Sequence, residues 1–351
     1  MGEPPLLNIG QKSKSFRLPK PISGIWGRSN HNQGVGLLAD ASISGRRYAR
    51  AVLSFNSNDS TGFKVFALNI PVGVDGVNSH PSNVDYLEKE RTLDIQDEQS
   101  YGRHDHPGGL QAHGDYVAVA MEQPKEEDNR AAVYFIRVDG FEPRHVYTHF
   151  LGGQPSNISV SLDAAASVGF IKLAPSGFLM AVAGADNGKN GIWFFDSKDS
   201  TINPTMNWKY VDFWEPDRMP DGVCDIKDGK VNSNCYIGAG GTASLVTDCD
   251  GQIYLVCLTG TSGRGKDYEY AQIMHLSRDA SGRIKLESIW HDKRPLGFSV
   301  LREISFRWGA GVNVSTDGKL VLLSTEKRHR KSDNDYVDGI IRISGQNTLN
   351  I

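Results

Sequence analysis

The sequence lacks the features that mark membrane-spanning, nucleic-acid-binding and helical proteins. No apolar run approaches the ~20 residues of a membrane-spanning helix. Lysine and arginine (38) do not outnumber aspartate and glutamate (41), so the formal charge is −3 and no basic surplus is available for a phosphate backbone. No stretch sustains the apolar period of an amphipathic helix. These absences predict an all-β protein with no membrane span and no general affinity for nucleic acid.

Cysteine is scarce and has no metal-binding spacing. The four cysteines include no Cys-x-x-Cys, which argues against a cysteine zinc site. Cys224 and Cys235 bracket a polar insertion and could close a small loop if the protein is exported. Cys257, within YLVCL, is expected to be buried in a strand. The first sixteen residues lack the apolar segment of a signal peptide, so secretion would need a leader that this sequence does not contain, and the compartment stays open.

Glycine is plentiful, and short β-like segments recur in a fixed order. The 38 glycines in 351 residues suit many short strands joined by tight turns. Five times, a glycine-marked strand precedes a turn, an almost wholly apolar strand and further strands with polar ends. The marker glycines are Gly34, Gly109, Gly169, Gly241 and Gly311. Because each unit buries little alone, only a ring or stack of units makes a core.

The repeat predicts one domain over residues 1–351, since no proline- or serine-rich linker divides the units. The unit boundaries are expected near 21–97, 98–151, 152–215, 216–292 and 293–351. Strands are predicted at 34–40, 49–55, 62–70, 90–96, 108–114, 116–122, 131–138, 145–150, 168–174, 178–184, 191–197, 207–214, 241–248, 252–258, 271–277, 284–291, 310–316, 319–325 and 339–344. The apolar second strands should be buried on both faces by neighbouring sheets.

The two ends of the chain are predicted to meet in one sheet. The fifth unit lacks a fourth strand before Ile351, whereas residues 14–20 (KSFRLPK) are β-like and precede the first unit. Pairing of 14–20 with the last sheet would close a ring without free edges. With these repeated units and this closure, the sequence resembles a five-bladed β-propeller with four-stranded antiparallel blades over essentially the whole chain. A six-bladed ring stays open if a long segment between units contains another sheet.

The resemblance is to a divergent propeller. The Trp-Asp signature of WD repeats and the kelch signature are absent, and the blades resemble those of uncharacterised microbial propeller proteins with segments similar to HPGGLQ (106–111) and FRWGAG (306–311). In propellers, the loops that lead into the innermost strands share one face with the loops between second and third strands. The resemblance thus implies the location of a site but no catalytic residue.

The loops that lead into the first strands carry dense polar clusters in units one, two and five. Candidate substrate-binding residues there are Asn30, His31, Asn32, Gln33, Arg103, Asp105, Arg307 and Trp308, and candidate catalytic residues are His104 and His106. Neighbouring glycines leave space for a ligand to approach the backbone. The open alternative is that these side chains hydrogen-bond one another and brace the ring.

Acidic or amide residues follow the second strands at matching positions in four units. Glu122 and Glu326 are candidate catalytic carboxylates, because a pair of carboxylates flanks the scissile bond in sugar hydrolysis. Asn56, Asp186 and Asn187 are the corresponding candidates for substrate binding. The alternative is that these groups accept backbone hydrogen bonds and cap loops.

No cofactor and no metal site are predicted. His104 and His106 could share a ligand set with His31 or Asp186, but neither His-Glu-x-x-His nor Asp-x-Asp-x-Asp occurs, so calcium and a transition metal stay minor alternatives. A Gly-x-Ser-x-Gly elbow is absent. GTSGRGK (260–266) departs from a phosphate loop because Asp267 follows the lysine.

These patterns favour an enzyme of hydrolase or lyase type that processes a small molecule or glycan at one polar site at the centre of the ring. A biosynthetic cyclase or pericyclase of Diels–Alder type is one alternative, since positioning and hydrogen bonds can suffice where no nucleophile is evident. A lectin-like or protein-interaction module is the other, although a lectin should repeat its pocket and the loops here differ. We expect a monomer or a weak dimer.

Overall fold

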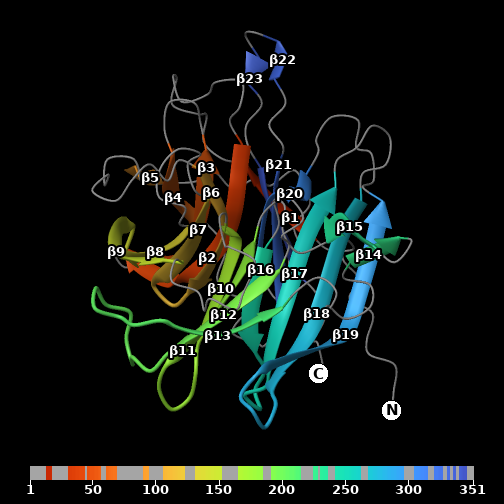
Figure 1. Cartoon of the computed structure of the whole chain (residues 1–351). Helices are drawn as coiled ribbons and strands as arrows, with labels where there is room; N and C mark the ends of the chain where they lie inside the picture. Colours follow the sequence, from red (N-terminus) through yellow and green to blue (C-terminus); the bar gives the residue numbers. More distant parts are fainter. Residues whose placement is uncertain are drawn as a thin grey trace.

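The structure, a computed structural model, describes a set of strands and their connections. The described residues are 13–17, 31–43, 46–56, 61–68, 90–94, 106–122, 131–151, 165–184, 191–214, 224–227, 230–235, 242–261, 268–295, 304–314, 320–326, 330–332, 335–336 and 340–345. Their regular secondary structure consists of β-strands, as the sequence predicted (Figure 1). A search of these residues finds no helix with the length and apolar character needed to cross a membrane.

Three sheets are four-stranded and antiparallel, and their strands follow chain order. The first contains β6 (His106–His113), β7 (Tyr116–Glu122), β8 (Ala132–Asp139) and β9 (Glu142–Phe150). The second contains β10 (Ala165–Lys172), β11 (Phe178–Gly184), β12 (Ile192–Ser197) and β13 (Lys209–Trp214). The third contains β16 (Thr242–Thr247), β17 (Ile253–Thr261), β18 (Tyr268–Arg278) and β19 (Ile284–Pro295).

The first and last units share one eight-stranded sheet, where the sequence had predicted two separate sheets. Its order is β1 (Ser13–Arg17), β24 (Ile340–Gly345), β21 (Leu320–Glu326), β20 (Ile304–Val314), β2 (His31–Ile43), β3 (Arg46–Asn56), β4 (Thr61–Leu68) and β5 (Glu90–Asp94). Each half of four strands is antiparallel, and a parallel bridge between Gly34 and Ala310 joins the halves. The backbones of β2 and β20 approach closely because Gly311 has no Cβ, which would otherwise overlap the backbone oxygen of Val35.

The N-terminal strand adds to the last sheet, as the sequence predicted. β1 pairs antiparallel with β24, with Phe16 opposite Ile341. The strand spans Ser13–Arg17 rather than residues 14–20. Both ends of the chain are therefore held in one sheet by backbone hydrogen bonds, which covers an edge that would otherwise be exposed.

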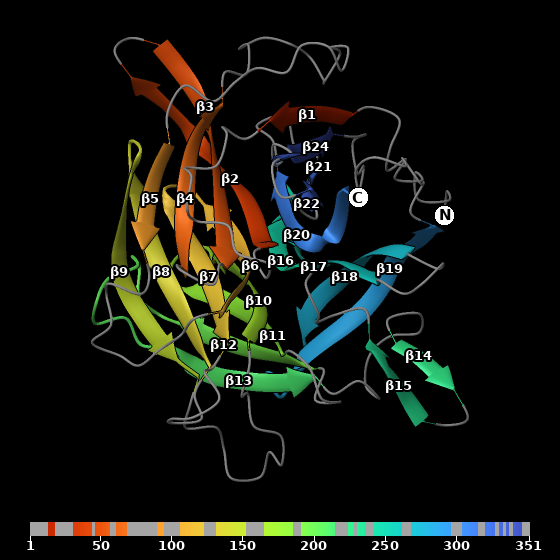
Figure 2. The same cartoon turned by 90° about the horizontal axis from the view of Figure 1, so that it is seen from above.

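The sheets are arranged around a common centre in an all-β propeller. Figure 2 shows β2, β6, β10, β16 and β20 nearest to this centre and the later strands farther out. Two short hairpins stand apart from these sheets, and neither was predicted: β14 (Cys224–Lys227) with β15 (Lys230–Cys235), and β22 (Arg330–Ser332) with β23 (Asp335–Tyr336). Among the described residues, the long segment between β13 and β16 thus contains a two-stranded hairpin and not the further four-stranded sheet of a six-bladed ring.

The second strands carry the core, because each packs against sheets on both faces. In β7, Val117, Val119 and Met121 belong to the cluster shared with β3 and β4, whereas Ala118 and Ala120 belong to the cluster shared with β10 and β12. All five side chains are fully buried. This alternation confirms the burial predicted from the apolar second strands, and it means that the core lies between neighbouring sheets rather than at the centre of the ring.

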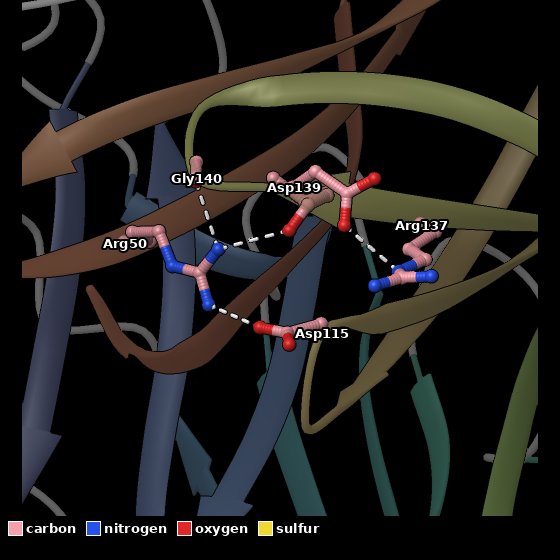
Figure 3. Close-up of polar contacts among 6 residues, drawn as sticks. Arg50, Asp115, Arg137, Asp139 and Gly140 are labelled. Atoms are coloured by element: carbon pink, nitrogen blue, oxygen red, sulfur yellow. Dashed lines mark hydrogen bonds and ion pairs between the residues drawn. The ribbon is translucent and has the colours of Figure 1, made fainter.

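A buried arginine in β3 hydrogen-bonds to the neighbouring sheet of β6–β9. Arg50 of β3 donates to Asp115 Oδ1 at 2.6 Å and to the backbone oxygens of Val138 and Gly140 at 3.0 and 2.8 Å (Figure 3). Its side chain is 2% exposed. The three acceptors lie in or beside the turns between β6 and β7 and between β8 and β9, so one guanidinium fixes the two turns of the neighbouring sheet.

An aromatic cluster fills the space between β9 and the sheet of β10–β13. Phe135 stacks on Trp208 and on Tyr147, and His149 meets Phe195 edge-on with ring centroids 5.5 Å apart. Burial lowers the pKa of His149 to about 4, because a charged imidazolium loses its hydration in this apolar surrounding. The Nε2 atom of His149 is buried and has no hydrogen-bond partner. This ring is therefore held in its neutral form.

The ion pairs of Figure 3 provide one test of these packing arguments. We expect Arg50→Met to lower the free energy of unfolding by about 2–3 kcal/mol, because the buried carbonyl oxygens and Asp115 lose their donor. Arg137→Met is the matched control: its pair with Asp139 joins side chains 49% and 41% exposed, so the loss should stay below about 1 kcal/mol. If urea unfolding gave equal losses of unfolding free energy for the two variants, the stabilising role of the Arg50 contacts would be contradicted.

His149 predicts a pH dependence of stability. The neutral form is favoured in the folded state, so this stability is fully present above the ordinary histidine pKa of 6.5 and is lost as the pH falls toward the folded pKa of about 4. The loss amounts to about 3 kcal/mol. In the unmodified protein, the free energy of unfolding should fall between about pH 7 and about pH 4, in part because of His149. His149→Phe should remove the contribution of this histidine to that fall. The surface variant His275→Phe should leave the fall unchanged. An unchanged pH dependence in His149→Phe would disprove the assignment.

Candidate active site

The innermost strands begin at the same end of the ring, which we call the leading end. Three contacts between their first residues place them there: Gln33 of β2 reaches His106 of β6, Gly108 of β6 lies against Ala166 of β10, and Gly309 of β20 lies against the backbone of Gln33. The second strand of each sheet, which runs antiparallel to the first, ends at this end. In the described residues, the starts of the first strands and the ends of the second strands therefore lie at the same end of the ring.

The strand register aligns the ends of three second strands with the starts of three first strands. Asn56 is opposite His31 in β3 and β2, and Glu122 is opposite His106 in β7 and β6. Glu326 is opposite Ile304 in β21 and β20. The polar residues at the ends of the second strands thus occupy equivalent places in three units, each against the first residue of the innermost strand.

The innermost strands are also bulged at the leading end. Register shifts fall at Asn32–Gly34 in β2, Pro107–Leu110 in β6, Ala165–Ser167 in β10 and Ser305–Ala310 in β20. The described part of β16 pairs in regular register with β17. Bulges redirect side chains away from the regular alternation of a strand and are frequent beside active sites. β2 has a second register shift farther along, between Leu38 and Ala41, so the feature that four innermost strands share is the bulge at the leading end.

The bulge in β20 is the longest and includes two candidate residues. Ser305 is opposite Thr325 and Ala310 is opposite Ser324, so residues 306–309 have no opposite partners in β21. Arg307 and Trp308 lie in this bulge. Gly309 completes it with a φ of +137°, a conformation that residues with a side chain rarely adopt. Gly309 lies against the backbone of Gln33 at the start of β2, and Arg307 and Trp308 directly precede it in the bulge.

Gln33 and His106 form a contact between two units. Gln33 Nε2 lies 2.9 Å from His106 Nε2, and Gln33 is 5% exposed. An amide nitrogen can only donate, so His106 Nε2 is the acceptor in this contact. This contact is of the type considered as the alternative in the sequence analysis, in which the polar side chains hydrogen-bond one another and brace the ring. It orients the imidazole of His106, a half-buried residue at the first position of β6.

Below this contact, Gln111 joins three innermost strands. Its Oε1 accepts from the backbone nitrogens of Phe170 and Leu245 at 3.0 and 2.8 Å, and its Nε2 donates to the oxygen of Leu245 at 2.6 Å. Gln111 is 4% exposed. Gly169 gives it room, since a Cβ there would lie 2.9 Å from Oε1. The side chain lies between β6, β10 and β16, farther from the leading end than His106.

Sequence reasoning missed Gln111. A signal was present, because Gln111 is a polar residue between the apolar Leu110 and Ala112, in a strand that was expected to face the ring centre. A buried amide needs several partners. The sequence does not reveal which backbone groups supply them, because they belong to strands 59 and 134 residues away.

The candidate residues are described to different extents. The structure gives the side chains of Gln33 and His106, and it gives the backbone position of His31, Asn32, Asn56, Glu122, Arg307, Trp308 and Glu326. Asn30, Arg103, His104, Asp105, Asp186 and Asn187 lie outside the described residues. Within the described part of the chain, no three histidine, cysteine or acidic side chains gather as a metal ligand set would. The histidine set considered from the sequence includes His104 and Asp186, so it falls outside that search.

Comparison with known proteins supports the fold. No family model matches the chain, and no curated protein matches it in sequence. Among solved structures, the catalytic domain of the Coprinopsis cinerea GH62 α-L-arabinofuranosidase aligns with a TM-score of 0.51 and 13% identity, over 95% of this chain and 96% of that chain. An endo-arabinase from Bacteroides thetaiotaomicron aligns with a TM-score of 0.42 and 11% identity, over 91% and 95% of the two chains. At these identities the first likeness shows the fold alone.

Gln111 can be tested by a pair of glutamine variants. Gln111→Leu leaves two backbone nitrogens and one oxygen without their side-chain partner, so the free energy of unfolding should fall by about 3 kcal/mol or more. Gln272→Leu is the matched control, because Gln272 is 5% exposed but bonds one side chain, Ser288, and its loss should be about 1 kcal/mol. Similar losses in urea unfolding would show that Gln111 does not join the strands as described.

Proposed function

We propose that this chain is a five-bladed propeller enzyme that cleaves a glycosidic bond in a small glycan or glycoside. The site is the leading end of the ring, with Glu122 and Glu326 as the acid–base carboxylates. His106 is the histidine of the site, and Gln33 is the residue that positions it. Arg307 and Trp308 contribute to substrate binding from the bulge of β20.

The blade count follows from the halves of the eight-stranded sheet. Strands β2–β5 form one antiparallel half, and β20, β21, β24 and β1 form the other. A single parallel bridge joins them, between Gly34 and Ala310. We count these halves as two blades that touch at the ring centre, which gives five blades together with the three four-stranded sheets.

The observation that carries the proposal is the shared position of Glu122 and Glu326. Each ends a second strand opposite the first residue of its innermost strand. Two carboxyl groups that enter one site from different blades can serve as acid and as base or nucleophile across a glycosidic bond. The contact between Gln33 and His106 supports the same location, because it fixes an imidazole in register with Glu122.

A single site explains the differences among the blades better than five equivalent sites. β6 and β20 have bulges of different length, and the described part of β16 has none. A module that binds one ligand per blade would keep these features equal. The asymmetry therefore favours one central site, and hence an enzyme over a repeated lectin.

The choice of a sugar rests partly on analogy of fold. The aligned Coprinopsis cinerea domain is an arabinofuranosidase. The same fold can support other chemistry, so the analogy selects the first substrates for a test and does not replace one. Aryl glycosides of pentoses and hexoses, followed by arabinose-containing polysaccharides, are the first panel.

The proposal predicts separate effects on turnover and on folding. Glu122→Gln and Glu326→Gln should each lower kcat by about 10²–10⁴-fold on any glycoside that the protein cleaves, because an amide cannot transfer the proton. The unfolding free energy of each should stay within about 1–2 kcal/mol of the unmodified protein. Glu287→Gln, at an exposed position in β19, is the matched control and should keep full activity.

Three results would count against this function. Unchanged turnover in Glu122→Gln or Glu326→Gln would remove that carboxylate from the mechanism. A large loss of stability in either variant would favour the loop-capping role instead. Calorimetric binding of an oligosaccharide with no release of reducing sugar would identify a binding module and disprove the enzyme.

A further inference from the structure

The hairpin β14–β15 belongs to the connection that leads into β16. β13 runs toward the leading end, because strands alternate in direction from β10 to β13, and the chain then passes through Cys224–Lys227 and Lys230–Cys235 before β16 begins at Thr242. Figure 2 shows the hairpin outside the ring of sheets. It forms a two-stranded sheet of its own, and an isolated hairpin of this size is only marginally stable in water.

The ends of this hairpin are two cysteines that the register places opposite each other. Cys224 pairs with Cys235, and beyond a register shift between Cys224 and Ile226 the pairing resumes with Ile226 opposite Val231 and Lys227 opposite Lys230. Opposite residues of an antiparallel pair have Cα atoms about 4.5–5.5 Å apart. The Cα atoms of a disulfide lie about 4.4–6.8 Å apart. The backbone thus already has the separation that a disulfide requires.

The other two cysteines, Cys257 and Cys249, have no cysteine opposite them in a strand pair. Cys257 is 3% exposed in the core between the second and third four-stranded sheets, and burial raises the pKa of its thiol well above the usual range. Its thiolate is therefore scarce in the folded protein. Cys249 is exposed in the turn between β16 and β17, and the chain must run the length of β16 to reach it. Neither cysteine is a register partner of another cysteine.

We propose that Cys224 and Cys235 form an intramolecular disulfide that closes the β14–β15 hairpin. The two thiols lose their hydrogens and two electrons as the S–S bond forms. A low-molecular-weight disulfide accepts both and is cleaved to two thiols. The bond restricts the unfolded chain and so stabilises a hairpin that packing alone supports poorly. Such a bond forms and persists in an oxidising compartment.

The test uses the full chain with Cys249→Ser, which leaves three cysteines of the original four. The reduced, folded protein is incubated with glutathione disulfide, denatured, and titrated with a chromogenic thiol reagent. We expect one thiol to remain, that of Cys257, and the protein mass to fall by two hydrogen atoms. The protein is then digested with trypsin, which cleaves beyond Lys227 and Lys230, and with chymotrypsin, which cleaves beyond Tyr236 and so separates Cys235 from Cys257. The peptides that contain Cys224 and Cys235 should be joined until a reductant is added.

A second variant separates this bond from simple reaction with glutathione. With Cys235→Ser added, Cys224 has no cysteine opposite it in the hairpin, and we expect it to form a mixed disulfide, which the added mass of glutathione reveals. The proposal is overturned if three thiols remain after incubation of the first variant. It is equally overturned if Cys224 and Cys235 each carry glutathione, or if either is joined to Cys257.

Discussion

One buried amide, that of Gln111, holds the centre of the structure together. The innermost strands β6, β10 and β16 meet there through the nitrogens of Phe170 and Leu245 and the oxygen of Leu245, all bound to Gln111. A propeller keeps its apolar core between neighbouring sheets, so its centre must be joined by polar contacts or close backbone approach. Both occur in this protein: Gln111 joins three strands, and Gly34 lets β2 approach β6.

The position of Gln111 also bears on the site that we propose. With this side chain between three of the innermost strands, the polar groups nearer the leading end are those left to meet a ligand. The bulges in β2, β6, β10 and β20 and the contact between Gln33 and His106 lie there. Four of the innermost strands thus share irregular pairing at the leading end, where we propose the site, although β2 has a further register shift between Leu38 and Ala41.

Much of the fold could be predicted because its strands follow local rules. The alternation in β7 sends Val117 and Val119 to one core and Ala118 and Ala120 to the next, and this follows from an apolar strand with a sheet on each face. The pairing of β1 with β24 was predictable because the last unit lacked a strand and the N-terminus supplied one. The union of the first and last units in one sheet was not predicted, because it depends on how closely two innermost strands approach.

The sequence by itself determined the strands, their order, the closure by the N-terminal strand, and the face on which Glu122 and Glu326 end their strands. These properties depend on residue period and on turns, which act within a few residues. Only the tertiary structure decided the partners of Gln111, the contact of Gln33 with His106 and the clamp of Arg50 on the next sheet. Those contacts join residues 59 or more positions apart, so they exist only once the sheets have packed together, and no local pattern specifies them.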